Sequence, residues 1–342
     1  MATPMRLSSL ICIERSKGLT SSGRWPWSWH ALNNRDTVKP TALMHIPDNF
    51  LSTPVWASLD AVSIGAVGLM IKRAGRDLPD TRIPLLGVMG AFVFAAQMIN
   101  FPVGAGTSGH LVGAALLACA LGPPAAVLVM TTILVIQAFV FQDGGVLALG
   151  ANVFNMAVVG VLAGYLPFQL WGAARRRTAI FAGGFLSVLV AGSLALSELL
   201  ISGVRMPRLL VFTSLGLFAV NAAIEGAITV SVVQALDKLN PGFVQRPDKS
   251  TSRILVVLST AALLLGMAGF LLASSAPDAI QSLGQTLKMS GQSSFQTPMA
   301  NYSVGGFESA WLRRAIAGLT GLLLICGLCL AGARVIGRRR SA

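Results

Sequence analysis

The sequence has little charge. Charged residues make up 11% of its 342 positions, whereas hydrophobic residues make up 54%. An ordinary soluble domain carries about 25% charged residues, so this composition excludes a chain that is mainly soluble. Several apolar runs reach the roughly 20 residues that a helix needs to cross a bilayer. We therefore predict an all-α fold, a polytopic helical membrane protein in contact with the lipid bilayer.

Two sequence patterns, one that binds nucleotides and one that binds nucleic acids, are also absent. The sequence has no G-x-x-x-x-G-K-[ST] motif, so it lacks the loop that cradles nucleotide phosphates and we expect no ATPase site. Its net charge is +13, but the basic residues lie at the ends of apolar runs, where they orient helices. No basic stripe interleaved with aromatic residues occurs, so we expect no nucleic acid partner.

Cysteine and histidine are scarce. Of the four cysteines, Cys326 and Cys329 form a C-x-x-C pattern inside an apolar run. Redox or metal chemistry is one interpretation of that pattern, and close packing of small side chains in a membrane helix is the one we favour. The three histidines are His30, His45 and His110.

Two of these histidines lie in short turns beside membrane-length segments. His45 follows Met44 in the stretch MHIPDNFL, and His110 ends the stretch GTSGH. If Met44 is the first residue, its amine, the His45 backbone nitrogen and the two imidazoles supply four nitrogens to one cation. The first nitrogens form fused chelate rings, and four nitrogens in a plane suit Ni(II), while imidazole also suits Co(II), Cu(II) and Zn(II).

The stretches HIPDNFLS, GTSGHL and LGANVFNM resemble the CbiM/NikM family, the metal-binding membrane components of energy-coupling-factor (ECF) transporters for cobalt and nickel. The resemblance covers residues 44–240, with Asn49 where the family usually has glycine. It implies a seven-helix core, Co2+ or Ni2+ as the transported substrate, and Met44, His45 and His110 as metal ligands. It also implies a CbiQ/NikQ-like coupling subunit and CbiO/NikO-like ATPase subunits as partners, in the inner (plasma) membrane.

Residues 1–43 do not match the rest of the sequence. Three explanations compete: a disordered cytoplasmic arm, a processed leader, or a start of translation assigned too far upstream. No apolar stretch is long enough for a signal peptide, and we favour the upstream start because Met44 opens the family motif. If the extension stays attached, Met44 has a peptide nitrogen instead of an amine and the site loses a ligand.

Nine apolar segments follow. They are expected at about 54–72, 84–100, 110–121, 124–142, 147–170, 179–202, 208–236, 254–273 and 314–335. The segment 110–121 is short for a span, so it must be tilted, broken or buried in protein.

With the Met44 end outside, fifteen Lys and Arg residues lie inside, five outside and six in the extension. The positive-inside rule therefore predicts an extracytoplasmic metal site.

The last part of the chain reads as a separate unit. Residues 241–253 are rich in turn formers and predict a cytoplasmic linker. Residues 254–342 carry two spans around an outer loop, and SSAPD in that loop resembles the PDGLE segment of a CbiN/NikN-like accessory unit. The match is short, because Ala279-Ile280-Gln281 departs from the usual Gly-Leu-Glu.

Several polar residues are candidates for a supporting role. Metal-bound imidazoles need partners that orient them, and we consider Ser108, Asn152 and Asn155 for this, although the asparagines equally suit hydrogen bonds between helices. Asp48 is expected to form the loop instead of binding metal. Gln137, Gln142 and Asp143 mark an outer turn near the mouth of the site.

Three carboxylates in or near apolar segments leave other functions open. Asp60, Glu198 and Glu225 either assist proton release during metal binding or brace helices. We predict a metal-capturing importer subunit. The alternatives are a proton-coupled secondary transporter that uses these carboxylates and an intramembrane hydrolase that uses His110 and Asp60. Ligand type does not separate cobalt from nickel.

Overall fold

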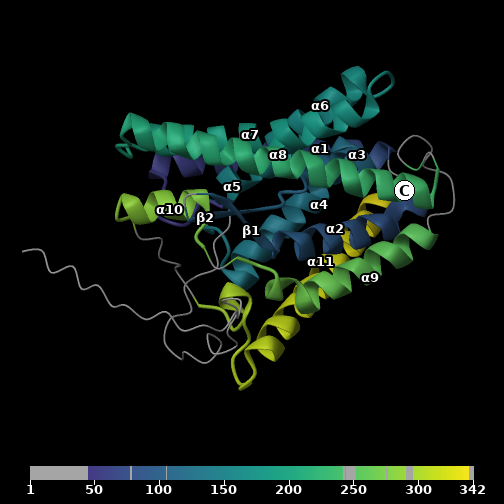
Figure 1. Ribbon diagram of the computed structural model, residues 1–342. Helices are drawn as coiled ribbons and strands as arrows, with labels where there is room; N and C mark the ends of the chain where they lie inside the picture. The colour runs from purple at the N-terminus through teal and green to yellow at the C-terminus, as the bar shows by residue number, and fades with distance from the viewer. Residues whose placement is uncertain are drawn as a thin grey trace, which may run out of the picture. The chain divides into compact units, whose positions relative to one another are not determined.

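The computed structural model describes residues 45–77, 79–104, 106–241, 243, 252–274, 276–289 and 296–338 (Figure 1). Met44, the extension 1–43 and most of the predicted linker 241–253 lie outside these described residues. The structure is predominantly helical, as the composition predicts.

Seven helical segments in the described part of the chain are long and apolar enough to cross a membrane. They are α1 (Thr53–Asp77), α4 (Pro123–Ile136) with the π-helical turn Gln137–Phe141, α5 (Leu149–Asn152) continued by the π-helical Val153–Val159 and α6 (Gly160–Trp171), α7 (Arg176–Ile201), α8 (Arg208–Leu239), α9 (Ser252–Ala268) with the 3₁₀ turn Gly269–Leu271, and α11 (Ala310–Arg338). The prediction of a polytopic all-α membrane protein is confirmed.

Two of the nine expected segments are shorter than predicted. α2 (Ile83–Gln97) has 15 residues, and α3 (Ala114–Leu121) has eight, all of them buried. Eight residues rise only about 12 Å, far less than the roughly 30 Å of a bilayer core. α3 packs against α4, α6, α7 and α8, so the segment expected at 110–121 is buried in protein and is too short to span a bilayer as a helix.

A β-hairpin that the sequence analysis did not predict separates α2 from α3. β1 (Asn100–Gly104) pairs antiparallel with β2 (Thr107–His110), with Asn100 opposite His110. Pro102 lacks the N–H that a helix needs, so the helix expected to reach residue 100 ends at Gln97. Non-helical backbone is tolerated at such a position where protein covers it, and all four residues of β2 are buried.

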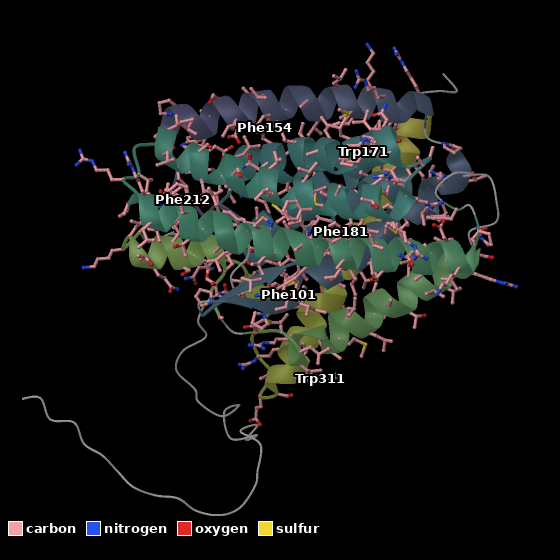
Figure 2. All side chains as sticks on the ribbon, turned by 45° about the horizontal axis from the view of Figure 1, so that its top comes forward. Phe101, Phe154, Trp171, Phe181, Phe212 and Trp311 are labelled. Carbon is pink, nitrogen blue, oxygen red and sulfur yellow. The ribbon has the colours of Figure 1, made fainter. Side chains whose placement is uncertain are left out.

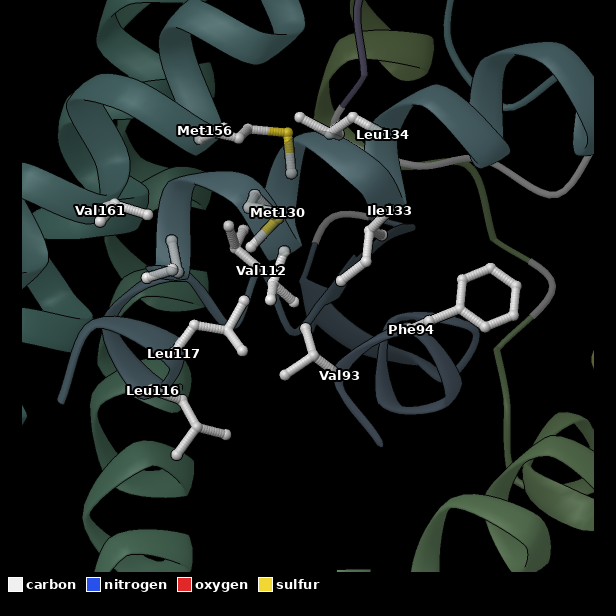
Figure 3. Close-up of a cluster of buried hydrophobic side chains, with 14 of the residues drawn as sticks. Val93, Phe94, Val112, Leu116, Leu117, Met130, Ile133, Leu134, Met156 and Val161 are labelled. Carbon is white, nitrogen blue, oxygen red and sulfur yellow. The ribbon is translucent and has the colours of Figure 1, made fainter. Parts of the chain in front are cut away.

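The apolar core surrounds α3. Figure 3 shows side chains of α2, α3 and α4 meeting there, with Val93, Leu117 and Met130 in the middle. Glycines let the outer helices approach closely: a Cβ on Gly184 of α7 would lie 2.7 Å from the Cα of Gly226 on α8. Small residues at helix contacts are how membrane helices pack, because lipid supplies no hydrophobic drive between them.

The C-terminal helices pack against the same body. α11 and α9 both contact α2 and each other (Figure 1). A Cβ on Gly87 of α2 would lie 3.0 Å from Cys326 Sγ, so the C-x-x-C segment fills a helix contact. Large apolar side chains remain on outward faces, among them Phe212 at 70% exposure, and Figure 2 shows Phe212 and Trp311 at the margin of the helical body.

Candidate functional site

The loop that carries His45 is fastened at its start. The side-chain oxygen of Asn152 accepts the N–H of Ile46 at 2.8 Å, and its amide donates to the Ile46 carbonyl at 3.1 Å. Ile46 also accepts the N–H of Gly145 at 2.9 Å. Asn152 therefore holds the backbone immediately after His45, not the His45 ring.

The same loop closes on the turn that follows α4. Asp48 accepts the N–H of Leu147 at 2.8 Å, which is a loop-forming contact. Gly145 fits so closely that a Cβ there would lie 2.4 Å from the Asp48 nitrogen. Asn49 has φ of 68°, a left-handed conformation that glycine adopts freely and asparagine tolerates. This explains why asparagine can replace the usual glycine of the motif.

His110 ends β2 and is held from the opposite direction. Its Nδ1–H donates to the Leu111 carbonyl at 2.7 Å, so Nε2 is the ring nitrogen that carries the lone pair. The Glu225 carboxylate of α8 accepts the N–H groups of Val112 and Gly113 at 2.7 and 2.8 Å. Asn221, also on α8, donates to the His110 carbonyl at 3.3 Å. α8 thus fixes the backbone around His110.

The two imidazoles lie together. Their ring centroids are 6.0 Å apart and the rings are inclined by 23°. Both are almost fully buried, His45 at 2% and His110 at 0% exposure. Burial, with a smaller effect from His45, lowers the pKa of His110 to about 4, so this imidazole is neutral at neutral pH.

Asp143 is the partner of His45. His45 Nδ1 lies 3.2 Å from Asp143 Oδ1, and a carboxylate accepts, so Nδ1 carries the proton in this orientation. His45 Nε2 is buried with no hydrogen-bond partner among the described residues. From the sequence, Asp143 is expected in the turn Asp143-Gly144-Gly145 near the site. That turn was the only sequence feature that pointed to Asp143, and the contact with His45 was not predicted.

The other expected residues have different contacts. Asn155 donates to Glu198 at 2.9 Å, and Ser108 Oγ donates to the Ala276 carbonyl at 2.7 Å. Neither hydrogen bond involves an imidazole. Asp60 accepts the N–H of Gly150 at 2.8 Å. These contacts join helices and loops around the site.

The C-terminal part of the chain reaches the site at two places. Ser108 of β2 donates its N–H to Pro277 at 2.8 Å, and Asp278 then begins α10 (Ala279–Thr286) by accepting the N–H of Gln281 at 2.6 Å. α10 lies beside β2 (Figure 1). The second contact is Tyr302, in a 3₁₀ turn (Ala300–Tyr302), whose hydroxyl donates to Asp143 Oδ2. The sequence analysis did not single out Tyr302.

Burial changes the acidity of both C-terminal groups. It raises the pKa of the Asp278 carboxyl well above its usual value, and it raises the pKa of Tyr302, with a further increase from the charge on Asp143. Tyr302 is therefore protonated at neutral pH and donates its hydrogen bond.

Within the described ranges no group of three His, Cys, Asp or Glu side chains is placed to hold a metal ion.

Comparison with known proteins decides the family. Residues 45–243 match the family model CbiM, described as the cobalt uptake substrate-specific transmembrane region. The chain belongs to the CbiM family.

Similar proteins are named for nickel transport, and the first of them extends the likeness beyond the matched region. A protein of Archaeoglobus fulgidus, provisionally named fused nickel transport protein NikMN, is 31% identical over 294 residues, which cover 83% of this chain and 96% of that protein. The fused nickel transport protein NikMN of Rhodobacter capsulatus is 40% identical over 144 residues, 41% of this chain and 42% of the relative. The present CbiM-family chain likewise carries a NikN-like unit after its CbiM region.

A solved structure supports the fold. The crystal structure of a truncated transition metal transporter superimposes with a TM-score of 0.51 at 31% sequence identity, covering 57% of this chain and 98% of that one. The helical CbiM fold is therefore shared with a transition metal transporter.

Proposed function

We propose that this CbiM-family protein is the metal-capturing membrane subunit of an ECF importer for Co(II) or Ni(II). The observation that carries the proposal is the pairing of His45 and His110. They come from loops before α1 and before α3, yet their buried rings lie 6.0 Å apart. Two imidazoles held together by separate elements suit a divalent transition metal ion.

The proposed ligand set joins these imidazoles to the chain end. With Met44 as the first residue, its amine and the His45 backbone nitrogen complete four nitrogen donors. The chelate that includes the His45 backbone nitrogen closes through Nδ1, which in the structure faces Asp143. A half-turn about the Cβ–Cγ bond exchanges Nδ1 with Cδ2 and Cε1 with Nε2. We propose that this turn accompanies metal capture, together with a shift of the ring that lets the Nε2–H group reach Asp143.

The proposed orientation places the site outside. α1 starts at Thr53, a few residues after His45, and ends at Asp77 after Lys72, Arg73 and Arg76. Positive charge at the far end of the first span favours that end inside the cell. Metal capture then occurs on the outer side of the plasma membrane, where an importer receives its substrate.

The contacts of the carboxylates favour this proposal over both alternatives. Asp60 and Glu225 accept hydrogen bonds from backbone N–H groups, and Glu198 accepts one from Asn155. Such fixed contacts suit helix bracing better than a proton path. Asp143, not Asp60, faces the histidine pair, which disfavours the hydrolase pairing of His110 with Asp60.

Transport measurements test the proposal directly. We expect the chain, co-produced with its coupling and ATPase subunits, to give ATP-dependent accumulation of radioactive nickel or cobalt in vesicles. Accumulation should vanish when the ATPase subunits are inactivated, because this chain has no phosphate-binding loop of its own. Uptake driven by a proton gradient without ATPase subunits would instead support a secondary transporter.

A further inference from the structure

A chain of hydrogen bonds connects the C-terminal unit with the loop after α4. The Tyr302 hydroxyl donates to Asp143 Oδ2, while the other oxygen of that carboxylate lies 3.2 Å from His45 Nδ1. The Tyr302 hydroxyl in turn accepts a hydrogen bond of 3.3 Å from Gln137 Nε2. Tyr302 is thus one hydrogen-bonded residue away from His45.

The same chain continues to the loop of the second histidine. Gln137 Nε2 also donates to Gln97 Oε1 at 2.9 Å, and Gln97 Nε2 donates to the Val112 carbonyl at 2.7 Å. Val112 follows Leu111, whose carbonyl holds the His110 ring. Gln137 Nε2 thus donates both to Tyr302 and to Gln97, so Tyr302 and Gln137 join the two histidine loops.

The position of Tyr302 is fixed by packing. Its ring stacks on Phe141 with centroids 4.6 Å apart and planes inclined by 10°. The centroid of the Phe94 ring lies 6.0 Å from that of Tyr302, and these two rings are tilted. Only 7% of the residue is exposed. Asn301 and Tyr302 both have φ of 54°, a costly conformation for residues other than glycine that persists where the surroundings impose it.

We propose that Tyr302 is a positioning residue of the metal site, acting from the C-terminal unit through Asp143 on His45. The proposal rests on the proposed function, because it requires His45 to be a metal ligand. A carboxylate that binds the N–H of a metal-ligating imidazole sets the orientation and basicity of that ring. The Tyr302 hydroxyl holds this carboxylate in place, so the C-terminal unit forms part of the site itself.

The replacement Tyr302→Phe removes the hydroxyl and keeps the stacked ring. We expect nickel and cobalt to bind roughly 10–100-fold more weakly to the chain that starts with a free Met44 amine, the usual cost of losing an outer partner of a metal ligand. The ligand-field absorption bands of the bound ion should also shift, because the His45 ring is less well oriented. Equilibrium dialysis with each metal and absorption spectroscopy measure the two effects.

The chain offers a matched control. It has two tyrosines, and the second, Tyr165, lies on α6, with its ring beside Phe168 at 5.9 Å. Tyr165→Phe loses the same hydroxyl outside this hydrogen-bond chain and should leave affinity and absorption bands unchanged. If Tyr302→Phe behaves like Tyr165→Phe while the unaltered chain binds metal, Tyr302 has no positioning role and the proposed function still stands. If the parent chain with a free Met44 amine binds no metal, the proposed function itself fails.

A double-mutant cycle tests the route through Asp143. In an Asp143→Asn background, Tyr302→Phe should cause little further loss of affinity, because the two residues act as one unit. Independent, additive losses would overturn the proposed route.

Fluorination provides a second probe if Tyr302→Phe does not fold. Growth of the Tyr165→Phe variant on 3-fluorotyrosine labels Tyr302 alone and strengthens its hydroxyl as a donor without changing the packing. We expect the absorption bands of bound cobalt or nickel to shift relative to the unlabelled variant. Identical bands would contradict the proposal.

Discussion

Replacement of His110 by alanine should abolish tight binding of nickel and cobalt. The variant removes one of four proposed nitrogen ligands, and the His110 ring is fully buried against His45. We expect a loss greater than the roughly 10–100-fold that follows removal of an outer partner of a metal ligand. Equilibrium dialysis of the purified chain and metal accumulation in intact cells measure this loss.

Tyr165→Phe supplies the control for this variant. Tyr165 lies on α6 outside the hydrogen-bond chain of the site, so with a free Met44 amine this variant should bind metal as the parent protein does. The thermal unfolding midpoint of the His110→Ala protein should stay close to that of the parent, because Glu225 holds the loop through the backbone of Val112 and Gly113. Undiminished metal binding by a folded His110→Ala variant would remove His110 from the site.

Residues 1–43, if they stay attached, should weaken metal binding as strongly as the loss of His110. An attached extension converts the Met44 amine into a peptide nitrogen, which gives up its proton to the ion far less readily than an amine does. The site would then need a second deprotonated peptide nitrogen besides that of His45. A protease site placed directly before Met44, so that cleavage releases the native amino end, allows both forms to be compared in one preparation. We expect tight nickel or cobalt binding after cleavage and weak binding before it.

The same cleavage in a His45→Ala background separates this effect from a general effect of the extension. Release of the amine should restore little affinity there, because the chelate has lost its imidazole. Equal metal retention before and after cleavage in the parent chain would exclude Met44 as a ligand. The metal would then be held by side chains alone, with His45 Nε2, which has no hydrogen-bond partner in the described part of the chain, as its first candidate donor.

Much of the architecture was predictable because each membrane helix corresponds to a continuous run of apolar residues in the sequence. The apolar runs gave the helices α1, α4 and α7–α9 close to their observed bounds. The segment 110–121 was recognised as too short to span. Its actual length of eight residues was hidden because Leu111 and Val112, which precede α3, are as apolar and as buried as helix residues would be.

The site was predictable only in part. His45 and His110 were singled out by their motifs, and the structure brings their rings together. The Asp143 contact was not predicted, because hydrogen bonds between distant residues depend on how helices pack and leave no periodic trace in the sequence. Tyr302 is the clearest case. It follows Asp143 by 159 positions and lies in a 3₁₀ turn outside the apolar runs that predict helices.

The buried carboxylates show a similar limit. Composition identified Glu225 as an ionisable residue inside an apolar segment, which indicates a role without specifying it. The structure specifies the contact: both carboxylate oxygens accept N–H groups immediately after Leu111. Sequence alone does not align α8 with that backbone, so bracing and proton transfer were both open.

X-ray absorption spectroscopy of the nickel-loaded protein with a free Met44 amine examines the coordination shell itself. We expect four nitrogen neighbours in a planar arrangement, two of them with the multiple-scattering pattern of imidazole, and loss of one imidazole in the His110→Ala variant. A six-coordinate shell dominated by oxygen, or a shell with a single imidazole in the parent protein, would contradict a site built from the chain end and two histidines.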